Sequence, residues 1–189
     1  CYHAVIEWRR LGYNAIRIYV KWHDMNLDVE KEVHRYIKED PLFMWAIRFE
    51  GEFDLGFYVW VDDVQEFAKK WFVFISKYKK YIQRHEIYEI VDMIHYPMKF
   101  LLDKAEEDEL IIGRKKATDY DEIDYEILKC VTRDGRSKVT EIAKKINLSS
   151  KAVIHRLRNL EKKGIILGYY TLIDETKLGS VFYKVDFYL

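Results

Sequence analysis

The stretch of residues 121–168 constrains the fold of this chain more than any other part of the sequence. Its apolar residues recur at helical spacing in three short runs, and only Asn147, Leu148 and Ser149 separate the second run from the third. Asparagine tolerates the left-handed backbone conformation that a tight turn needs, and serine is a good N-cap for the helix that follows. Three short helices joined in this way are typical of a helix-turn-helix, whose last helix lies in the major groove of DNA.

The charge of this stretch differs from the charge of the whole chain. The 189 residues carry 32 Lys and Arg against 32 Asp and Glu, so the formal net charge is +0. Residues 136–163 instead hold nine basic residues and only two acidic ones. A local excess of positive charge inside a neutral chain favours a surface that binds phosphates.

The third predicted helix offers the side chains that would contact DNA. Val153, Leu157 and Leu160 define its buried side, which leaves the other side to polar and basic residues. Hydroxyl, Lys and Arg side chains beside a positive helix N-terminus can bind phosphates or base edges. For His155, a solvated surface position is an equally good interpretation. We expect DNA contacts from Ser149, Ser150, Lys151, His155, Arg156 and Arg158, and from Arg136 and Lys138 before the second helix.

A different use of the same bundle stays open. Three helices with basic residues can also form a protein-interaction module, and Lys162 and Lys163 can be explained by the negative C-terminal end of their helix. Under either interpretation the first predicted helix buries one apolar side, made of Ile123, Ile127, Leu128 and Val131.

Residues 11–100 alternate between strand-like and helix-like patterns. The order is βαββαβ, which predicts a ferredoxin-like sheet with two helices and places the chain in the α+β class. The expected strands are Tyr13–Trp22, Met44–Phe49, Phe53–Val61 and Glu86–Ile94, with helices that start near Asp28 and Asp62.

Two helices can cover only one face of a four-stranded sheet. The other face would present Tyr19, Trp45, Tyr58 and Trp60, a large apolar patch if it stayed in water. We therefore expect this face to pack against a second sheet, from another protomer or from a tandem copy. The predicted assembly is a homo-oligomer formed through the sheet faces.

The two ends of the chain resemble each other. Residues 1–22 align without gaps on residues 168–189, so that Tyr2 meets Tyr169 and Leu11-Gly12 meets Leu178-Gly179 at an offset of 167 residues. This pattern favours a tandem-repeat protein, of which the chain covers about one period. The expected organisation is a hinge strand from a preceding unit (1–10), a βαββαβ domain (11–100), a linker (101–119), the helix-turn-helix domain (120–168), and the hinge and first strand of a second βαββαβ domain (169–189).

The helix-turn-helix stretch resembles that of the Lrp/AsnC (feast/famine) transcriptional regulators. The matching residues are Asp121-Glu122-Ile123-Asp124, Ile127-Leu128, Asp134-Gly135-Arg136, Glu141-Ile142-Ala143, Leu148-Ser149, Arg156, Leu160-Glu161, Gly164-Ile165-Ile166 and Gly168-Tyr169. The resemblance implies that residues 11–100 form the family's βαββαβ effector domain, called the RAM domain. It also implies that Gly51 and Asp54, in a Gly-x-x-Asp hairpin motif, lie near a site for an amino-acid effector. Here the effector-like domain precedes the helix-turn-helix, which departs from the family's order. Gly51 and Asp54 can also be explained as residues that only form the turn.

Several classes of function find no support in the sequence. Two cysteines are too few for a disulfide framework or a cysteine-based zinc site. His85-Glu86-Ile87-Tyr88-Glu89 begins like a zinc-protease motif but lacks the second histidine, and no phosphate-binding glycine loop or nucleophile–base set is present. No apolar run is long enough to cross a membrane, and no signal peptide opens the chain. We expect a cytoplasmic protein without enzyme activity, cofactor, metal or membrane partner.

The sequence therefore predicts a sequence-specific DNA-binding transcriptional regulator with duplex DNA as its partner. A small effector, such as an amino acid, would modulate it. The alternative is an effector-sensing or assembly subunit, or an architectural DNA-binding protein with little sequence specificity.

Overall fold

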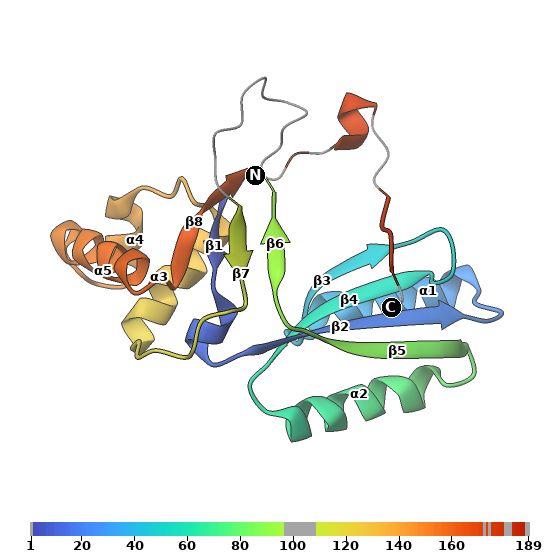
Figure 1. Cartoon of the computed structure of the whole chain (residues 1–189). Helices are drawn as coiled ribbons and strands as arrows, with labels where there is room; N and C mark the ends of the chain where they lie inside the picture. Colours follow the sequence, from blue (N-terminus) through green and yellow to red (C-terminus); the bar gives the residue numbers. More distant parts are fainter. Residues whose placement is uncertain (1, 97–108, 172, 174, 180–182, 188–189) are drawn as a thin grey trace. The chain divides into compact units, whose positions relative to one another are not determined.

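Two compact units make up the protein. In this computed structural model, the residues described are 2–96, 109–171, 173, 175–179 and 183–187 (Figure 1). Residues 7–119 form one unit, here called the sheet unit, and residues 1–6 and 120–189 form the other, here called the helix-turn-helix unit. The first strand of the chain therefore belongs with residues that follow it more than a hundred positions later.

The sheet unit has the βαββαβ order that the sequence predicts. Its four strands lie in the order β3-β4-β2-β5, and every neighbouring pair is antiparallel. This topology confirms the ferredoxin-like fold. The elements are β2 Asn14–Trp22, α1 Leu27–Glu39, β3 Phe43–Arg48, β4 Leu55–Val61, α2 Val64–Tyr78 and β5 Ile82–Ile90.

Shorter elements flank this sheet. A 3-10 turn, η1 Trp8–Leu11, precedes β2, and a small ladder of β6 Met93–His95 with β7 Leu110–Ile112 follows β5. The expected strand Glu86–Ile94 is wrong in its bounds. Pairing with β2 extends β5 back to Ile82, and β5 ends at Ile90, before β6 begins.

One apolar core holds both helices against one face of the sheet. Asn26 and Asp63 cap α1 and α2 by accepting hydrogen bonds from backbone N–H groups of the first helical turn. The spacing of apolar residues then turns one side of each helix toward alternate residues of the strands. The buried core includes Ile18, Val20, Val33, Phe57, Val59, Trp71, Phe74 and Tyr78.

The opposite face of the sheet is aromatic, as expected, but less exposed than expected. Tyr19 is only 4% exposed because Phe49, Phe53 and Tyr88 surround its ring. Burial raises the pKa of Tyr19 to about 12. Trp45 and Tyr88 remain nearly half exposed on this face.

The helix-turn-helix unit combines three helices with a two-stranded ladder. Strand β1 pairs antiparallel with β8, the strand that directly follows the last helix. Asn147 adopts a left-handed φ of 56°, which confirms the predicted turn between the last two helices. The elements are β1 Tyr2–Ile6, α3 Glu122–Arg133, α4 Val139–Lys145, α5 Ser150–Lys162, β8 Ile166–Thr171 and the 3-10 turn η2 Glu175–Leu178.

The core of this unit follows the predicted pattern except at Leu157, which is only partly buried, and at Ile123. Ile127, Leu128 and Val131 of α3 are buried, together with Val153 and Leu160 of α5. The predicted burial of Ile123 is wrong, because this residue is 37% exposed. It lies in the first turn of α3, where the neighbouring Asp124 is the buried residue and accepts a hydrogen bond from Arg156 of α5.

The ladder packs tightly on the turn between α3 and α4. The rings of Tyr2 and Tyr169 stack 5.7 Å apart and nearly parallel, and the Arg136 guanidinium lies 5.2 Å from the centre of the Tyr2 ring. The N–H of Gly135 donates to the carbonyl oxygen of Tyr2 at 2.7 Å. A Cβ on Gly135 would lie 2.9 Å from Cδ1 of Tyr2 and 3.1 Å from Cδ1 of Tyr169. Only glycine fits this position without a shift of the rings.

We predict that Gly135→Ala lowers the free energy of unfolding by about 1–3 kcal/mol, because the new methyl group overlaps two stacked rings. Urea denaturation of the full chain measures the change. Gly168→Ala is the matched control, since it lies in the same ladder and nothing stands within 4 Å of its added Cβ. Its effect should stay within about 0.5 kcal/mol, and equal effects of the two variants would contradict the packing argument.

Candidate DNA-binding surface

Helix α5 presents a basic, solvent-exposed side. Ser149 caps the helix by accepting a hydrogen bond from the N–H of Ala152 at 3.2 Å, so its hydroxyl is engaged within the turn. Lys151, His155 and Arg158 are exposed, as the sequence predicts, and Ser150 begins the helix. The positive end of the helix and these side chains share one surface.

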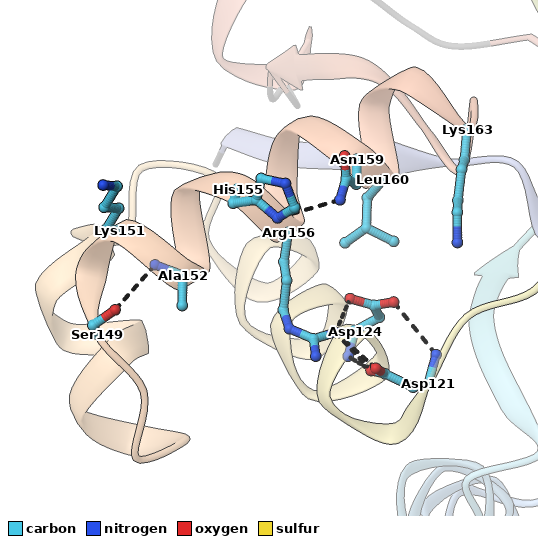
Figure 2. A pocket seen from close by; sticks show the side chains of 10 residues that line it. All are labelled: Asp121, Asp124, Ser149, Lys151, Ala152, His155, Arg156, Asn159, Leu160 and Lys163. Carbon is cyan, nitrogen blue, oxygen red and sulfur yellow. Dashed lines mark hydrogen bonds and ion pairs between the residues drawn. The ribbon is translucent and has the colours of Figure 1, made fainter.

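A hollow of about 610 Å³ runs along α5 (Figure 2). Lys151, His155, Asn159 and Lys163 follow one another at four-residue spacing along the helix and all line it. The sequence prediction includes the first two of these residues and misses Asn159 and Lys163. The four-residue spacing from His155 would have placed Asn159 and Lys163 on the same side of the helix. The side chain of Asn159 also contacts the His155 ring, with Nδ2 3.4 Å from Nδ1.

Arg156 differs from the exposed residues Lys151, His155 and Arg158 because its guanidinium binds two carboxylates of the same unit. Nη1 donates to both carboxylate oxygens of Asp121, at 2.9 and 2.8 Å, and to Oδ1 of Asp124 at 2.8 Å (Figure 2). The two aspartates also form the capping box at the start of α3. Arg156 therefore ties the middle of α5 to the first turn of α3.

The electrostatics of this cluster favour its charged form. The N–H of Asp124, followed by the Arg156 guanidinium, holds the pKa of Asp121 below its ordinary value. The same two carboxylates raise the pKa of Arg156. The side chain of Asp124 is 12% exposed and that of Asp121 is 54% exposed, so the stronger contact is the one with Asp124.

The two basic residues predicted before α4 lie in different surroundings. Arg136 packs over the Tyr2 ring, next to the β1–β8 ladder. Lys138 is the N-cap residue of α4 and makes no side-chain cap bond; its Nζ lies 3.9 Å from Oε1 of Glu141. Both side chains are exposed enough to reach a ligand, and neither lines the hollow along α5.

Gly51 and Asp54, the predicted effector residues, lie together in the sheet unit. Gly51 has a φ of 148°, a conformation that favours glycine, in the β3–β4 hairpin. Lys21 Nζ donates to the carbonyl oxygen of Gly51 at 3.1 Å and to Oδ1 of Asp54 at 2.8 Å. The N–H of Trp22 donates to the other Asp54 oxygen at 2.8 Å. Both carboxylate oxygens of Asp54 therefore have a partner at the end of β2.

A cavity of about 290 Å³ opens beside this hairpin. It combines an apolar wall with charged groups of both signs, since Glu30 and Arg48 form an ion pair of 2.9 Å at its edge. Gly51 is not among the residues that line it. The lining residues are Trp22, Met25, Glu30, Val33, His34, Arg48, Phe49, Asp54 and Leu55.

The part of the chain that the structure describes holds no group of three His, Cys, Asp or Glu side chains arranged for a metal ion. In the same residues, no helix has both the length and the apolar character needed to cross a membrane.

Two arginines on one helix give a test of these roles. We predict that Arg156→Gln lowers the free energy of unfolding by about 1–2 kcal/mol, because Asp124 loses a charged hydrogen-bond partner in a nearly buried place. Arg158→Gln removes the same charge from an exposed position of α5 and should leave stability within about 0.5 kcal/mol. Urea denaturation compares the two variants. A larger loss of stability in Arg158→Gln would contradict the assignment.

Known proteins resemble the helix-turn-helix unit in sequence. The family model described as "Winged helix-turn-helix DNA-binding" matches residues 120–166. The HTH-type transcriptional regulator LrpA of Pyrococcus horikoshii is 49% identical over 59 residues, which are 31% of this chain and 42% of LrpA. LrpB of Bacillus subtilis is 35% identical over 68 residues, which are 36% of this chain and 46% of LrpB. The chain thus spans less than half the length of these curated relatives.

Solved structures resemble a larger part of the chain. The siroheme decarboxylase NirDL has a TM-score of 0.54 at 14% identity, over 89% of this chain and 48% of NirDL. An AsnC family transcriptional regulator from Agrobacterium tumefaciens has a TM-score of 0.43 at 16% identity, over 52% of this chain and 67% of that protein. At such low identity the likeness to NirDL shows the fold and nothing about activity. The similarity in sequence lies in the helix-turn-helix segment, where the chain resembles proteins named as HTH-type transcriptional regulators.

Proposed function

We propose that this protein is a sequence-specific DNA-binding transcriptional regulator that reads duplex DNA with α5. The observation that carries the proposal is the exposed basic side of α5, which holds Lys151, His155 and Arg158. Lys151 lies in the first turn, beside the positive N-terminal end of the helix. A chain with no net charge concentrates positive charge on this surface. Such a local excess attracts the phosphate backbone.

The side chains divide by the kind of contact that each can make. Lys151 and Lys163 are flexible point charges suited to phosphates, whereas the flat guanidinium of Arg158 can donate two parallel bonds to a guanine edge. His155 and Asn159 can donate to or accept from base edges. At the borders of this surface, further contacts to the DNA backbone would come from Ser150, Arg136 and Lys138. Arg156 would act by holding α5 in place, because its guanidinium is bound to Asp121 and Asp124.

We predict that the protein binds duplex DNA with an affinity that falls steeply as salt rises, because bound phosphates release counterions. Fluorescence anisotropy over a series of salt concentrations measures the slope. Lys151→Gln should reduce that slope by about one unit if Lys151 contacts a phosphate. Lys31→Gln is the matched control, since it removes the same charge from an exposed position of α1 in the sheet unit. Binding that does not respond to salt would contradict the proposal.

Sequence specificity needs a separate experiment. Selection from a random DNA library should recover a recurring motif if base contacts from α5 decide binding. A footprint without sequence preference would instead support the architectural alternative, in which the same surface binds only the DNA backbone.

We further propose that a small zwitterionic effector, such as an amino acid, binds the cavity beside the β3–β4 hairpin. The ion pair of Glu30 and Arg48 would open, so that Glu30 meets an ammonium group and Arg48 a carboxylate. Trp22 and Leu55 would contact an apolar side chain. Because Asp54 and Gly51 are held by Lys21, their part would be to keep the hairpin in the shape that bounds the cavity.

We predict that calorimetry with a panel of amino acids detects binding to the full chain, and that Arg48→Gln abolishes it by removing the partner of the ligand carboxylate. Arg35→Gln is the control, because Arg35 is an exposed arginine of α1 outside the cavity lining. Binding that survives Arg48→Gln unchanged would show that the effector binds elsewhere.

The aromatic sheet face supports a proposed homo-oligomer. Trp45 is 47% exposed and Tyr88 is 43% exposed, on the face that the helices leave open. A second sheet packed there would remove both from water. Enzyme activity is not part of the proposal, because the relatives that match at 35–49% identity are named as regulators. A DNA partner is consistent with the cytoplasmic location that the sequence predicts.

A further inference from the structure

The ladder of β1 and β8 joins two segments that resemble each other in sequence. Tyr2 corresponds to Tyr169, and Leu11-Gly12 corresponds to Leu178-Gly179, at a constant offset of 167 residues. Each segment begins with a strand that belongs to the helix-turn-helix unit. The ladder therefore pairs two strands whose sequences are repeats of each other.

The two repeated segments also share local backbone structure. The turn η1 covers Trp8–Leu11, and Gly12 follows it with a φ of 86°. The turn η2 covers Glu175–Leu178, and Gly179 follows it with a φ of 73°. Both the 3-10 turn and the left-handed glycine recur at the offset that the sequence gives. A chance likeness of a few residues would not reproduce two consecutive backbone conformations at one offset.

The register of the ladder relates equivalent positions to one another. His3 pairs with Tyr170, and these two residues are equivalent in the repeat. Tyr2 pairs with Thr171, whereas Ala4, the equivalent of Thr171, pairs with Tyr169. Two equivalent strands in an antiparallel ladder are related by a local two-fold axis, and here the axis passes between His3 and Tyr170.

The tyrosine stack is the contact that such an axis produces. Tyr2 and Tyr169 are equivalent residues on one face of the ladder, and their rings stack at 5.7 Å with an angle of 8°. In an isologous contact the two partners use the same surface. A residue near the two-fold axis therefore contacts the equivalent residue of the other partner. This pair has that property within a single chain.

We propose that β1 and β8 form an internal two-fold contact, in which the chain binds its own repeated segment as two subunits of a homodimer would bind each other. The partner that this surface fits is the equivalent strand of the same polypeptide. A second chain is not needed there, because the strand that it would supply is already in place. The inference does not rest on DNA binding.

Disulfide trapping at the axis tests the proposal. In a background of Cys1→Ser and Cys130→Ala, the full chain with His3→Cys and Tyr170→Cys places two thiols at a directly paired position, within reach of a disulfide. These positions lie on the face opposite the tyrosine stack. We expect closure within one chain, with a yield that does not change with protein concentration. Mass spectrometry and non-reducing gels give the readout.

Single-cysteine variants test the competing arrangement. If equivalent strands of different chains paired about the same axis, His3→Cys alone would link two chains, and so would Tyr170→Cys alone. We expect neither single variant to form disulfide-linked dimers under oxidation. Disulfide-linked dimers from either one, or failure of the double variant to close, would overturn the proposal.

Two further pairs check the register and the symmetry. The pairs Tyr2→Cys with Thr171→Cys and Ala4→Cys with Tyr169→Cys are exchanged by the axis, so they should close with similar yields. The combination His3→Cys with Thr171→Cys places the thiols on opposite faces and should not close. If His3→Cys disturbs folding by removing the hydrogen bond from Nδ1 to the Thr132 carbonyl oxygen, the pair at Ala4 and Tyr169 decides the outcome.

Discussion

The pairing of β1 with β8 is the constraint on which the helix-turn-helix unit depends. It brings Tyr2 onto the turn between α3 and α4, where the N–H of Gly135 donates to its carbonyl oxygen. The two tyrosine rings then leave no room for a side chain at Gly135. The turn is thereby fixed against a strand that the sequence places far from it. Each helix is short and would be only marginally stable alone, so these contacts with the ladder help to stabilise the bundle.

The orientation of α5 follows from a second set of contacts. Val153 and Leu160 bury one side of the helix, and Arg156 binds the aspartates that cap α3. Apolar burial gives most of the stability but little direction, since it is roughly proportional to area. The charged hydrogen bonds add direction, because they are satisfied only in one relative placement of α3 and α5. The exposed side that remains is the basic one.

The sequence was sufficient for the fold wherever a periodic pattern existed. The βαββαβ order, the three helices and the Asn147 turn all follow from the spacing of apolar residues and from caps. The bounds of β5 were missed because they depend on its pairing with β2 rather than on its own composition. The burial of Ile123 was misjudged because Asp124 is the buried residue of this turn, and its partner Arg156 comes from another element.

The candidate site was predictable only in part. Exposure of Lys151, His155 and Arg158 follows from the buried side of α5, which the sequence defines. The contacts of Arg156 and Arg136 could not be read from the chain, because their partners, Asp121 and Tyr2, come from other elements. A basic residue in a DNA-binding motif can bind a carboxylate or an aromatic ring of its own domain instead of DNA. The sequence shows the charge of such a residue but not its partner.

The discontinuous make-up of the helix-turn-helix unit has a consequence for exchanging this domain between proteins. A fragment cut at residue 120 would carry all three helices but leave behind β1, and with it the strand partner of β8 and the ring that covers Gly135. An engineer who wished to transplant the domain would need two separate gene segments. Natural recombination meets the same obstacle, so a single crossover beside the helices would tend to yield a domain with an open edge.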